Sequence, residues 1–259
     1  SLVQSLRDAK LEPGSVQTFA TPRRLAISVT VAEGQEDVTQ EVTGPPARIA
    51  FDDEGRPTKA ALAFAQRNGI SEDALTTKAT PKGDYLAATI FTPGKRTLEL
   101  APTMLAKAVQ GLKWPKAMTW GRDVGPFIRP IHWMVALYGG EQIDLEWMGI
   151  KAANKSRGHR FMAPEEFEVT DAQQWCASLR DAFVEPDPNR RSTLISDGGN
   201  KIADSVNGKL VMDTGLLEEL TFLSEWPVPL LGSFDSEFLT VPSSALVTSM
   251  RVHQKYAAI

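Results

Sequence analysis

The sequence predicts an α+β fold with a mixed or antiparallel sheet, packed helices and a helix-rich C-terminal part. Apolar residues alternate with small or polar ones from residue 25 to residue 31, which is the spacing of a half-buried strand. Stretches with helical spacing and capping residues dominate after residue 171. Strand and helix patterns do not alternate regularly along the chain, which disfavours a repeating βαβ arrangement.

The first half of the chain predicts short elements of both kinds. Residues 1–12 indicate a short helix, and residues 58–69 indicate a helix that Thr58 caps and Asn68-Gly69 ends. The segment "TGPPAR", residues 43–48, predicts a break because neither proline can donate a hydrogen bond to a strand ladder. Further along we expect a strand over 85–91, a helix over 98–112, and strands over 127–138 and 143–150 around Gly139-Gly140.

The second half predicts helices over residues 171–183, 187–206 and 216–226. Asp187 caps the second of these and Pro188 takes its first position. Gly198-Gly199 weakens that helix by about 1 kcal/mol per glycine relative to alanine. In the third helix we expect one apolar stripe and the tryptophan after it to pack into the core: Leu216, Leu220, Leu223 and Trp226.

A polar segment bounded by glycines, residues 149–159, has the composition of a linker. We therefore expect two lobes, a mixed α/β lobe over residues 1–150 and a helix-rich lobe over residues 151–259.

Composition excludes several classes of protein. The net charge of −4 argues against a basic nucleic-acid binder, so a nucleic-acid partner would have to meet a local patch. Cys176 is the single cysteine, which excludes an internal disulfide and fits a reducing cytosol. No apolar run approaches the length that spans a bilayer, and the first residues lack a signal pattern. We expect a cytoplasmic protein with no membrane partner.

The sequence carries no recognisable catalytic or metal-binding motif. His132, His159 and His253 lie far apart, so no pair shares a helix face as metal ligands do. No phosphate-binding loop, dinucleotide fingerprint or nucleophile elbow is present. We therefore assign no catalytic residue, no metal ligand and no cofactor to this chain.

Three basic segments are candidates for phosphate contact. In "FATPRRLA", residues 19–26, Arg23 and Arg24 precede a strand and could clamp phosphate or carboxylate. The alternative is a solvated strand end with one arginine in a structural ion pair.

The second segment, residues 112–137, interleaves aromatic and cationic side chains. Such an arrangement can stack bases and hold a nucleic-acid backbone, but large aromatics more often pack a core. The residues are Trp114, Trp120, Phe127 and Trp133 with Lys113, Lys116, Arg122 and Arg129. We favour packing for the aromatics and a structural role for His132.

The third segment, residues 151–161, is the strongest local candidate for phosphate binding. It has no acidic residue between Glu146 and Glu165, and its cations are Lys151, Lys155, Arg157 and Arg160. The alternative is a solvated charged loop.

Together these fragments resemble one family. "FATPRRLA", "KAMTW…FIRPIHW", "RGHRF" and the stretch from "LTFLSEWPVPLLGSF" to "MRVHQKY" are similar to the β subunit of the bacterial heterotetrameric glycyl-tRNA synthetase. The motifs follow the family's order from Phe19 to Tyr256. Thr119 stands where the family usually has arginine, and Ala257 where it usually has an aromatic residue.

The resemblance implies a division of labour. It places catalysis, with ATP and Mg, on an α subunit, and makes this chain the N-terminal portion of a longer β subunit. The implied partners are the α subunit and tRNA(Gly), in an α2β2 assembly. It also implies a fold similar to the editing-type domains of the phenylalanyl-tRNA synthetase β subunit.

Within that family we expect this chain to be a scaffold that contacts tRNA through six cations: Lys151, Lys155, Arg157, Arg160, Arg23 and Arg24. Glycine is the smallest amino acid, so the active site of a synthetase can exclude larger amino acids by size. A second, hydrolytic site would then have few mischarged products to remove. The alternatives are an editing-type hydrolase of mischarged aminoacyl-tRNA and a purely structural assembly module.

Overall fold

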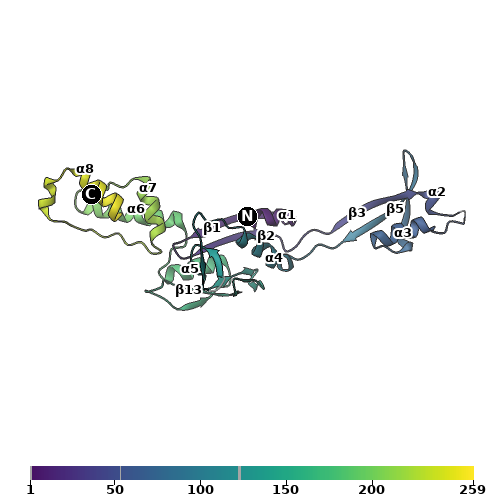
Figure 1. Ribbon diagram of the computed structural model, residues 1–259, viewed down its shortest axis with the longest axis horizontal. Coiled ribbons are helices and arrows are strands. Elements are labelled where there is room, and N and C mark those ends of the chain that lie inside the picture. Colours follow the sequence, from purple (N-terminus) through teal and green to yellow (C-terminus); the bar gives the residue numbers. More distant parts are fainter. Residues whose placement is uncertain (1, 53, 122–123) are drawn as a thin grey trace. The chain divides into compact units, whose positions relative to one another are not determined.

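The computed structural model describes residues 2–52, 54–121 and 124–259 of the chain (Figure 1). It has the predicted α+β composition, with helices and several small, mainly antiparallel sheets. The chain forms two compact units: unit 1 contains residues 1–3, 13–31 and 101–259, and unit 2 contains residues 4–12 and 32–100. This partition differs from the predicted lobes 1–150 and 151–259, and that division stays a prediction.

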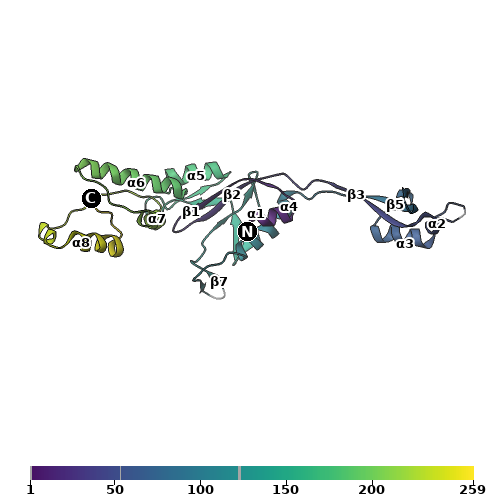
Figure 2. The same ribbon diagram turned by 90° about the horizontal axis from the view of Figure 1, so that it is seen from above.

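Unit 2 is built on a three-stranded antiparallel sheet in the order β3-β5-β4. Figure 2 labels two of these strands, β3 and β5. Its strands are β3 (Val38–Pro46), β4 (Leu75–Thr80) and β5 (Gly83–Thr92). Its short helices are α2 (Ala47–Ala50), α3 (Lys59–Asn68) and η1 (Glu72–Ala74). Ala50, Ala61 and Leu86 are fully buried, and three partly buried side chains pack against them: Phe51, Phe64 and Leu75.

The predicted break at residues 43–48 is correct in position, because β3 ends at Pro46 and α2 begins at Ala47, although both prolines still belong to the strand. The strand lies at the edge of its sheet and shifts register between Thr43 and Pro46, so the prolines interrupt no central ladder. Gly44 lets α3 approach, since a Cβ there would lie 2.9 Å from the ring of Phe64. The helix over 58–69 is confirmed, but the Thr58 hydroxyl donates to the Ile49 carbonyl (2.6 Å) and does not cap α3.

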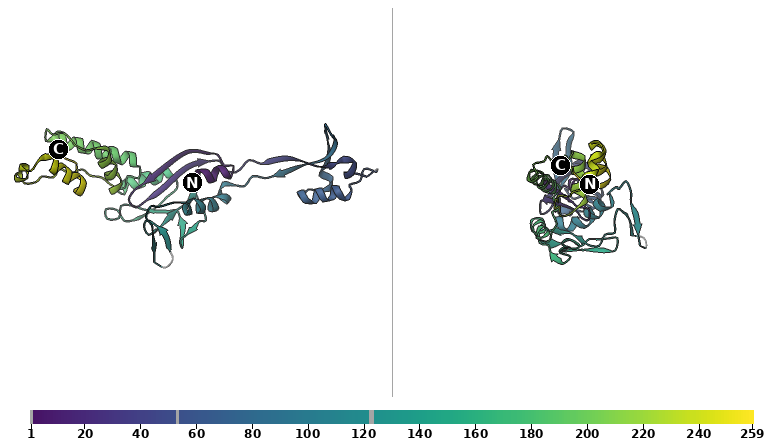
Figure 3. Two further views of the ribbon diagram at one scale, coloured as in Figure 1. Left: turned by 45° about the horizontal axis from the view of Figure 1, so that its top comes forward. Right: turned by 90° about the vertical axis from the view of Figure 1, so that its left-hand side faces the viewer.

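The chain begins with α1 (Leu2–Asp8), as predicted, and a β-hairpin follows. Strands β1 (Pro13–Ala20) and β2 (Leu25–Val31) pair antiparallel along unit 1 (Figure 3). The bounds of β2 match the prediction, but Leu25 is 58% exposed, so the apolar alternation does not mark its buried face. The sequence pattern did not predict β1, whose Phe19 is buried and packs edge-on against Trp175 at 5.6 Å.

The described residues between 97 and 168 form one helix and many short strands. The helix α4 (Thr97–Gln110) agrees with the prediction for residues 98–112. The strands are β6 (Met118–Trp120), β7 (Val124–Phe127), β8 (Met134–Val135), β9 (Leu137–Tyr138), β10 (Glu141–Gln142), β11 (Glu146–Trp147), β12 (Ile150–Ala153), β13 (Lys155–Arg157) and β14 (Glu166–Glu168).

The predicted long strands over 127–138 and 143–150 are wrong, although their turn is correct. Tyr138 pairs with Glu141 across Gly139-Gly140, whose φ angles of 57° and 85° suit a tight hairpin. On either side the chain divides into two-residue pieces, and β12 pairs parallel with β8 and antiparallel with β11. The backbone hydrogen bonds of this region are therefore spread over several partners.

The linker predicted over residues 149–159 is also wrong, because it forms β12 and β13. Ala152 and Ser156 are buried, and the Trp175 indole donates to the Ser156 hydroxyl at 3.1 Å. Alternate residues of this polar stretch thus face the interior, while its cations face outward.

The C-terminal part is helix-rich, as predicted. Its helices are α5 (Ala172–Asp181), α6 (Pro188–Ser205), α7 (Thr214–Leu223), η2 (Ser236–Thr240), α8 (Ser243–Ser249) and η3 (Met250–Gln254). The carboxylates of Asp171, Asp187 and Asp213 accept backbone N–H groups at the starts of α5, α6 and α7. Helices α6 and α7 pack against each other.

The expectation that one stripe of α7 and Trp226 pack into the core is only partly correct. Leu216 is buried, but Leu223 is 57% exposed. The helix ends at Leu223, and Trp226 is half-buried with its ring edge-on to Phe183 at 5.9 Å. The end of α7 therefore lies at the surface of unit 1.

Candidate nucleic-acid interface

A buried ion pair ties the turn between β1 and β2 to the segment after α7. The Arg24 guanidinium pairs with the Glu225 carboxylate, and their side chains are 6% and 4% exposed. Arg24 also donates to the carbonyls of Arg157 (2.9 Å) and Gly158 (2.6 Å), and the Thr21 hydroxyl donates to Glu225 (2.6 Å). This is the structural ion pair that the sequence left as the alternative for one of the two arginines.

A second buried arginine reinforces the same junction. Arg191 is fully buried and donates to three carbonyls, those of Thr221 (2.8 Å), Glu185 (2.7 Å) and Ala20 (2.6 Å). Burial lowers the pKa of its guanidinium, although Glu185 and Glu225 oppose this effect. The network holds the β1–β2 turn in a fixed position on the helical part of unit 1.

Strand pairing places an acidic residue opposite three of the predicted tRNA-binding cations. Lys151 lies opposite Glu146 in the β11–β12 register, at 4.0 Å between charged atoms. Arg157 pairs with Glu166 at 2.6 Å across β13 and β14. Lys155 lies opposite Glu168 in the same register. The stretch is free of acids only along the sequence, since its neighbours in space carry compensating charge.

The other two candidates, Arg23 and Arg160, are exposed and form no ion pair within the described part of the chain. They come from distant segments, yet both line one groove of about 270 Å³. The remaining lining residues are Pro22, His159, Phe161, Leu223, Ser224, Glu225 and Trp226. Of the six predicted residues, the structure therefore brings together two that are free to meet an anion.

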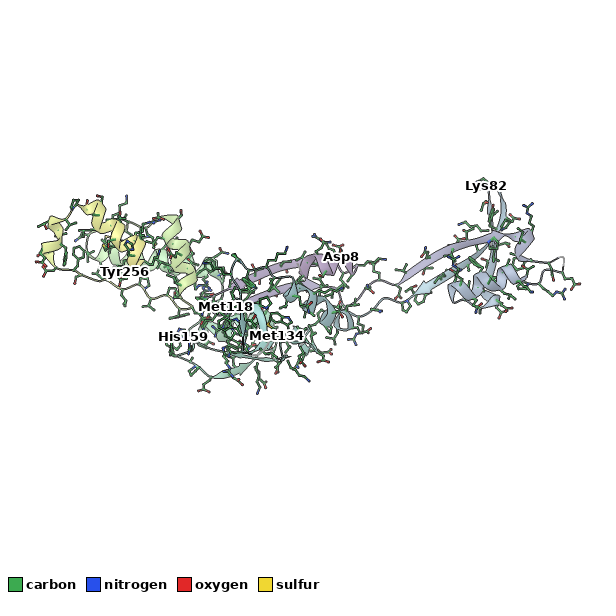
Figure 4. All side chains as sticks on the ribbon, in the orientation of Figure 1. Asp8, Lys82, Met118, Met134, His159 and Tyr256 are labelled. Atoms are coloured by element: carbon green, nitrogen blue, oxygen red, sulfur yellow. The ribbon has the colours of Figure 1, made fainter. Side chains whose placement is uncertain are left out.

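The segment that carries Arg160 is held in place by its own backbone. Gly158 packs so closely that a Cβ would lie 2.3 Å from the Ala163 carbonyl oxygen. His159 donates its backbone N–H to Ala182 (2.9 Å), and its Nδ1 accepts from the backbone N–H groups of Phe161 and Met162 (both 3.3 Å). Figure 4 labels His159 on this turn between β13 and β14.

Phe161 is the residue that the charge pattern missed. The residue is 79% exposed, and the Arg160 guanidinium lies 5.3 Å from the ring centroid. The motif "RGHRF" contains the signal, because an aromatic residue directly follows a cation in a fixed turn.

The aromatic residues of the second segment pack against one another, in agreement with the favoured interpretation. Phe127 meets Trp114 and Trp147 edge-on at 5.0 and 5.4 Å, and Trp120 donates to the Phe127 carbonyl at 3.0 Å. Trp133 lies under the guanidinium groups of Arg24 and Arg157, at 5.6 and 6.0 Å. Arg122, a cation of this segment, lies outside the described residues.

Residues 2–52, 54–121 and 124–259 contain no cluster of three or more His, Cys, Asp or Glu side chains suited to a metal ion. Among the same residues, no helix has the length and apolar character needed to cross a bilayer.

Fold and groove thus define an α+β protein with a small cationic, aromatic-lined surface site. A family model described as the glycyl-tRNA synthetase beta subunit matches residues 1–259. The chain belongs to this family.

Relatives named glycine--tRNA ligase beta subunit agree with this assignment. The protein of Syntrophus aciditrophicus is 42% identical over 254 residues, which cover 98% of this chain and 37% of the relative. That of Marinobacter nauticus is 42% identical over 258 residues, with coverage of 98% and 37%. That of Geobacter metallireducens is 40% identical over 259 residues, with coverage of 100% and 38%. The chain therefore spans little more than a third of the length of these relatives.

Proposed function

We propose that this chain is the N-terminal part of a glycine–tRNA ligase β subunit and supports the ATP-dependent charging of tRNA(Gly) by contacting the tRNA. ATP and Mg act on the partner α subunit, the whole enzyme is an α2β2 assembly, and it works in the cytoplasm. The observation that carries the tRNA contact is the convergence on one groove of Arg23 and Arg160, two cations that form no ion pair with the described residues.

The proposed contact is electrostatic and is made to phosphate groups of the tRNA. Arginine presents a planar fork of donors that matches phosphate oxygens. Lys151, Lys155 and Arg157 each have a glutamate as cross-strand neighbour, which lowers the local positive potential they offer. Arg24 donates its hydrogen bonds to backbone carbonyls inside the fold. We therefore assign the phosphate contact to Arg23 and Arg160.

The experiment compares two groups of alanine variants in the full two-subunit enzyme. Arg23→Ala and Arg160→Ala should weaken tRNA(Gly) binding, and each should flatten the slope of log affinity against log salt by about 0.7–0.9. Lys155→Ala and Arg157→Ala are controls of the same charge change with a glutamate neighbour, and their slopes should stay close to wild type.

A wild-type slope in the Arg23→Ala/Arg160→Ala double variant would overturn the proposed contact. Equal flattening in the lysine and arginine controls would show instead that the whole basic face binds tRNA.

Hydrolytic editing, together with the likeness to phenylalanyl-tRNA synthetase editing-type domains, is the weaker proposal. His159 is the imidazole that lines the groove, and two backbone N–H groups occupy its Nδ1. A general base of the usual kind has a carboxylate or carbonyl at that nitrogen, which orients the ring and increases its basicity. This arrangement suits a fixed turn better than proton transfer.

Assembly with a partner subunit is a second candidate function, favoured by one exposed apolar segment. Residues 228–239 carry large hydrophobic side chains that are 49–84% exposed: Val228, Leu230, Leu231, Phe234, Phe238 and Leu239. Apolar surface of this density marks interfaces with other protein. We propose that it packs against the α subunit.

Leu230→Asp in the full-length protein tests this assignment. Leu230 is 84% exposed, so the variant should fold normally and lose co-purification with the α subunit. Retained co-purification, or a variant that unfolds or aggregates alone, would place the segment inside the longer chain's own fold and overturn the assignment.

A further inference from the structure

The groove beside Arg23 and Arg160 contains an aromatic ring that charge recognition alone does not explain. Phe161 is 79% exposed, so it contributes little to the core of unit 1. An exposed ring costs hydration free energy unless a ligand covers it. Its neighbours nonetheless hold its backbone in place through the Nδ1 atom of His159.

The Phe161 ring has a cation on one side. The Arg160 guanidinium lies 5.3 Å from the ring centroid, within the range of a cation–π contact. Arginine and aromatic side chains are the groups on which proteins stack unpaired bases. Arg160 and Phe161 together therefore form a stacking surface with a positive charge attached.

The size of the groove limits what can enter. Its volume of about 270 Å³ lies below the range of about 300–1,000 Å³ typical of pockets for drug-sized ligands. One base and its sugar suit such a space, whereas a paired stem is far too wide. In paired arms the bases are stacked inside the helix, and only unpaired nucleotides can offer a free face.

We propose that this groove takes one unpaired nucleotide of RNA. The base stacks on Phe161, and the flanking phosphates lie against Arg23 and Arg160. Stacking is tolerant of sequence because every base has a π-face, so the groove selects single-stranded RNA over duplex and not one base over another. This inference rests on the proposed tRNA contact and specifies the part of the RNA that meets the groove.

The first test measures affinity in the full two-subunit enzyme with tRNA(Gly). Phe161→Ala should weaken binding by about 5- to 150-fold, the equivalent of a stacking contact of about 1–3 kcal/mol, and should leave the salt slope unchanged. Phe161→Trp should restore affinity because it keeps a π-face. The control is Phe91→Ala, a similarly exposed phenylalanine (60%) on β5.

The second test locates the contact. A photoreactive benzoylphenylalanine replaces Phe161, and the cross-linked nucleotide of tRNA(Gly) is mapped. A cross-link to an unpaired nucleotide supports the inference. A cross-link within a paired arm, or a yield no higher than from position 91, overturns it.

The two proposals fail in different ways. If the arginine variants flatten the salt slope and Phe161→Ala binds like wild type, the tRNA contact stands and the stacking inference falls. If neither set of variants changes binding, both fall.

Discussion

Arg191 shows how one side chain can organise a junction. It has no exposed surface, and its partners are three carbonyl groups from separate parts of unit 1. Its planar guanidinium reaches all three in fixed directions. A lysine ammonium cannot, because it is a single point at the end of a flexible stem.

Arg191→Lys should therefore destabilise the protein by about 1–3 kcal/mol for each buried carbonyl that is left without a donor. Urea unfolding followed by circular dichroism would measure the loss. Arg190→Lys is the matched control, since Arg190 pairs with Glu185 but is 59% exposed, and it should cost under about 1 kcal/mol. Similar losses in both variants would contradict this account.

Asp213 gives the fold a predictable response to acid. Its carboxylate pairs with Arg251 and accepts the Leu216 N–H at 3.0 Å, and these contacts lower its pKa below the usual 3.8. A lowered pKa in the folded state stabilises the fold above the unfolded value. That contribution is lost as the pH falls below about 3.8 toward the lowered value.

Asp213→Asn should unfold at a lower urea concentration than wild type at pH 7, and the difference should shrink at pH 3. Asparagine still caps the helix, so the change reports the charge. Arg251→Gln should reproduce the pattern if the ion pair is the cause. A difference that is constant with pH would refute it.

The candidate site was only half visible in the sequence, for a residue-level reason. Arg23 and Arg160 stood among six predicted cations, but their freedom depends on which neighbours strand pairing supplies. Glu166 and Glu168 lie beyond the turn that carries Phe161, and they meet β13 only when β14 pairs with it. Charge along a chain does not reveal charge in space.

At the scale of elements, the two glycines of α6 have a packing role that helix propensity alone hides. A Cβ on Gly198 would lie 2.7 Å from Cγ of Pro229, and one on Gly199 would lie 2.9 Å from Cδ2 of Leu210. The proline ring is tied to its backbone, whereas the leucine end can rotate. The two glycines lower the helix propensity of α6, but the missing side chain of Gly198 lets Pro229 pack against the helix.

Gly198→Ala should destabilise the protein by about 1–3 kcal/mol, as overpacking does. Gly199→Ala should be close to neutral, because the gain of about 1 kcal/mol in helix propensity offsets a small shift of Leu210. Thermal unfolding of the two variants side by side would check this. A stabilised Gly198→Ala would mean that Pro229 does not press on the helix.

Helices with caps were the predictable elements of this fold. Asp171, and Asp187 followed by Pro188, mark starts that the structure reproduces, since their signals are local. The strands β8 to β11 were not predictable. Each has two residues, too few to show a period, and their pairing depends on partners elsewhere in unit 1.

At the scale of the whole molecule, the proposed division of labour predicts that this chain alone does not catalyse adenylate formation. The sequence has no ATP-binding motif, and the proposal places adenylate formation on the α subunit. The purified chain should therefore give no glycine-dependent ATP–pyrophosphate exchange above a blank. Activity that survives further purification would contradict the proposal, and the two-subunit enzyme is the positive control.

The contacts of Arg24 and Arg191 also determine how long the β1–β2 hairpin remains without its partners during synthesis. Arg24 precedes its partner Glu225 by 201 residues, and Arg191 follows Ala20 by 171. At about 5–20 residues per second, a ribosome needs on the order of 10–40 s to pass from one end of the Arg24–Glu225 pair to the other. The first hairpin must wait that long for its partners. On the ribosome, a basic turn stands exposed to chaperones and to cellular RNA until the segment after α7 emerges to cover it.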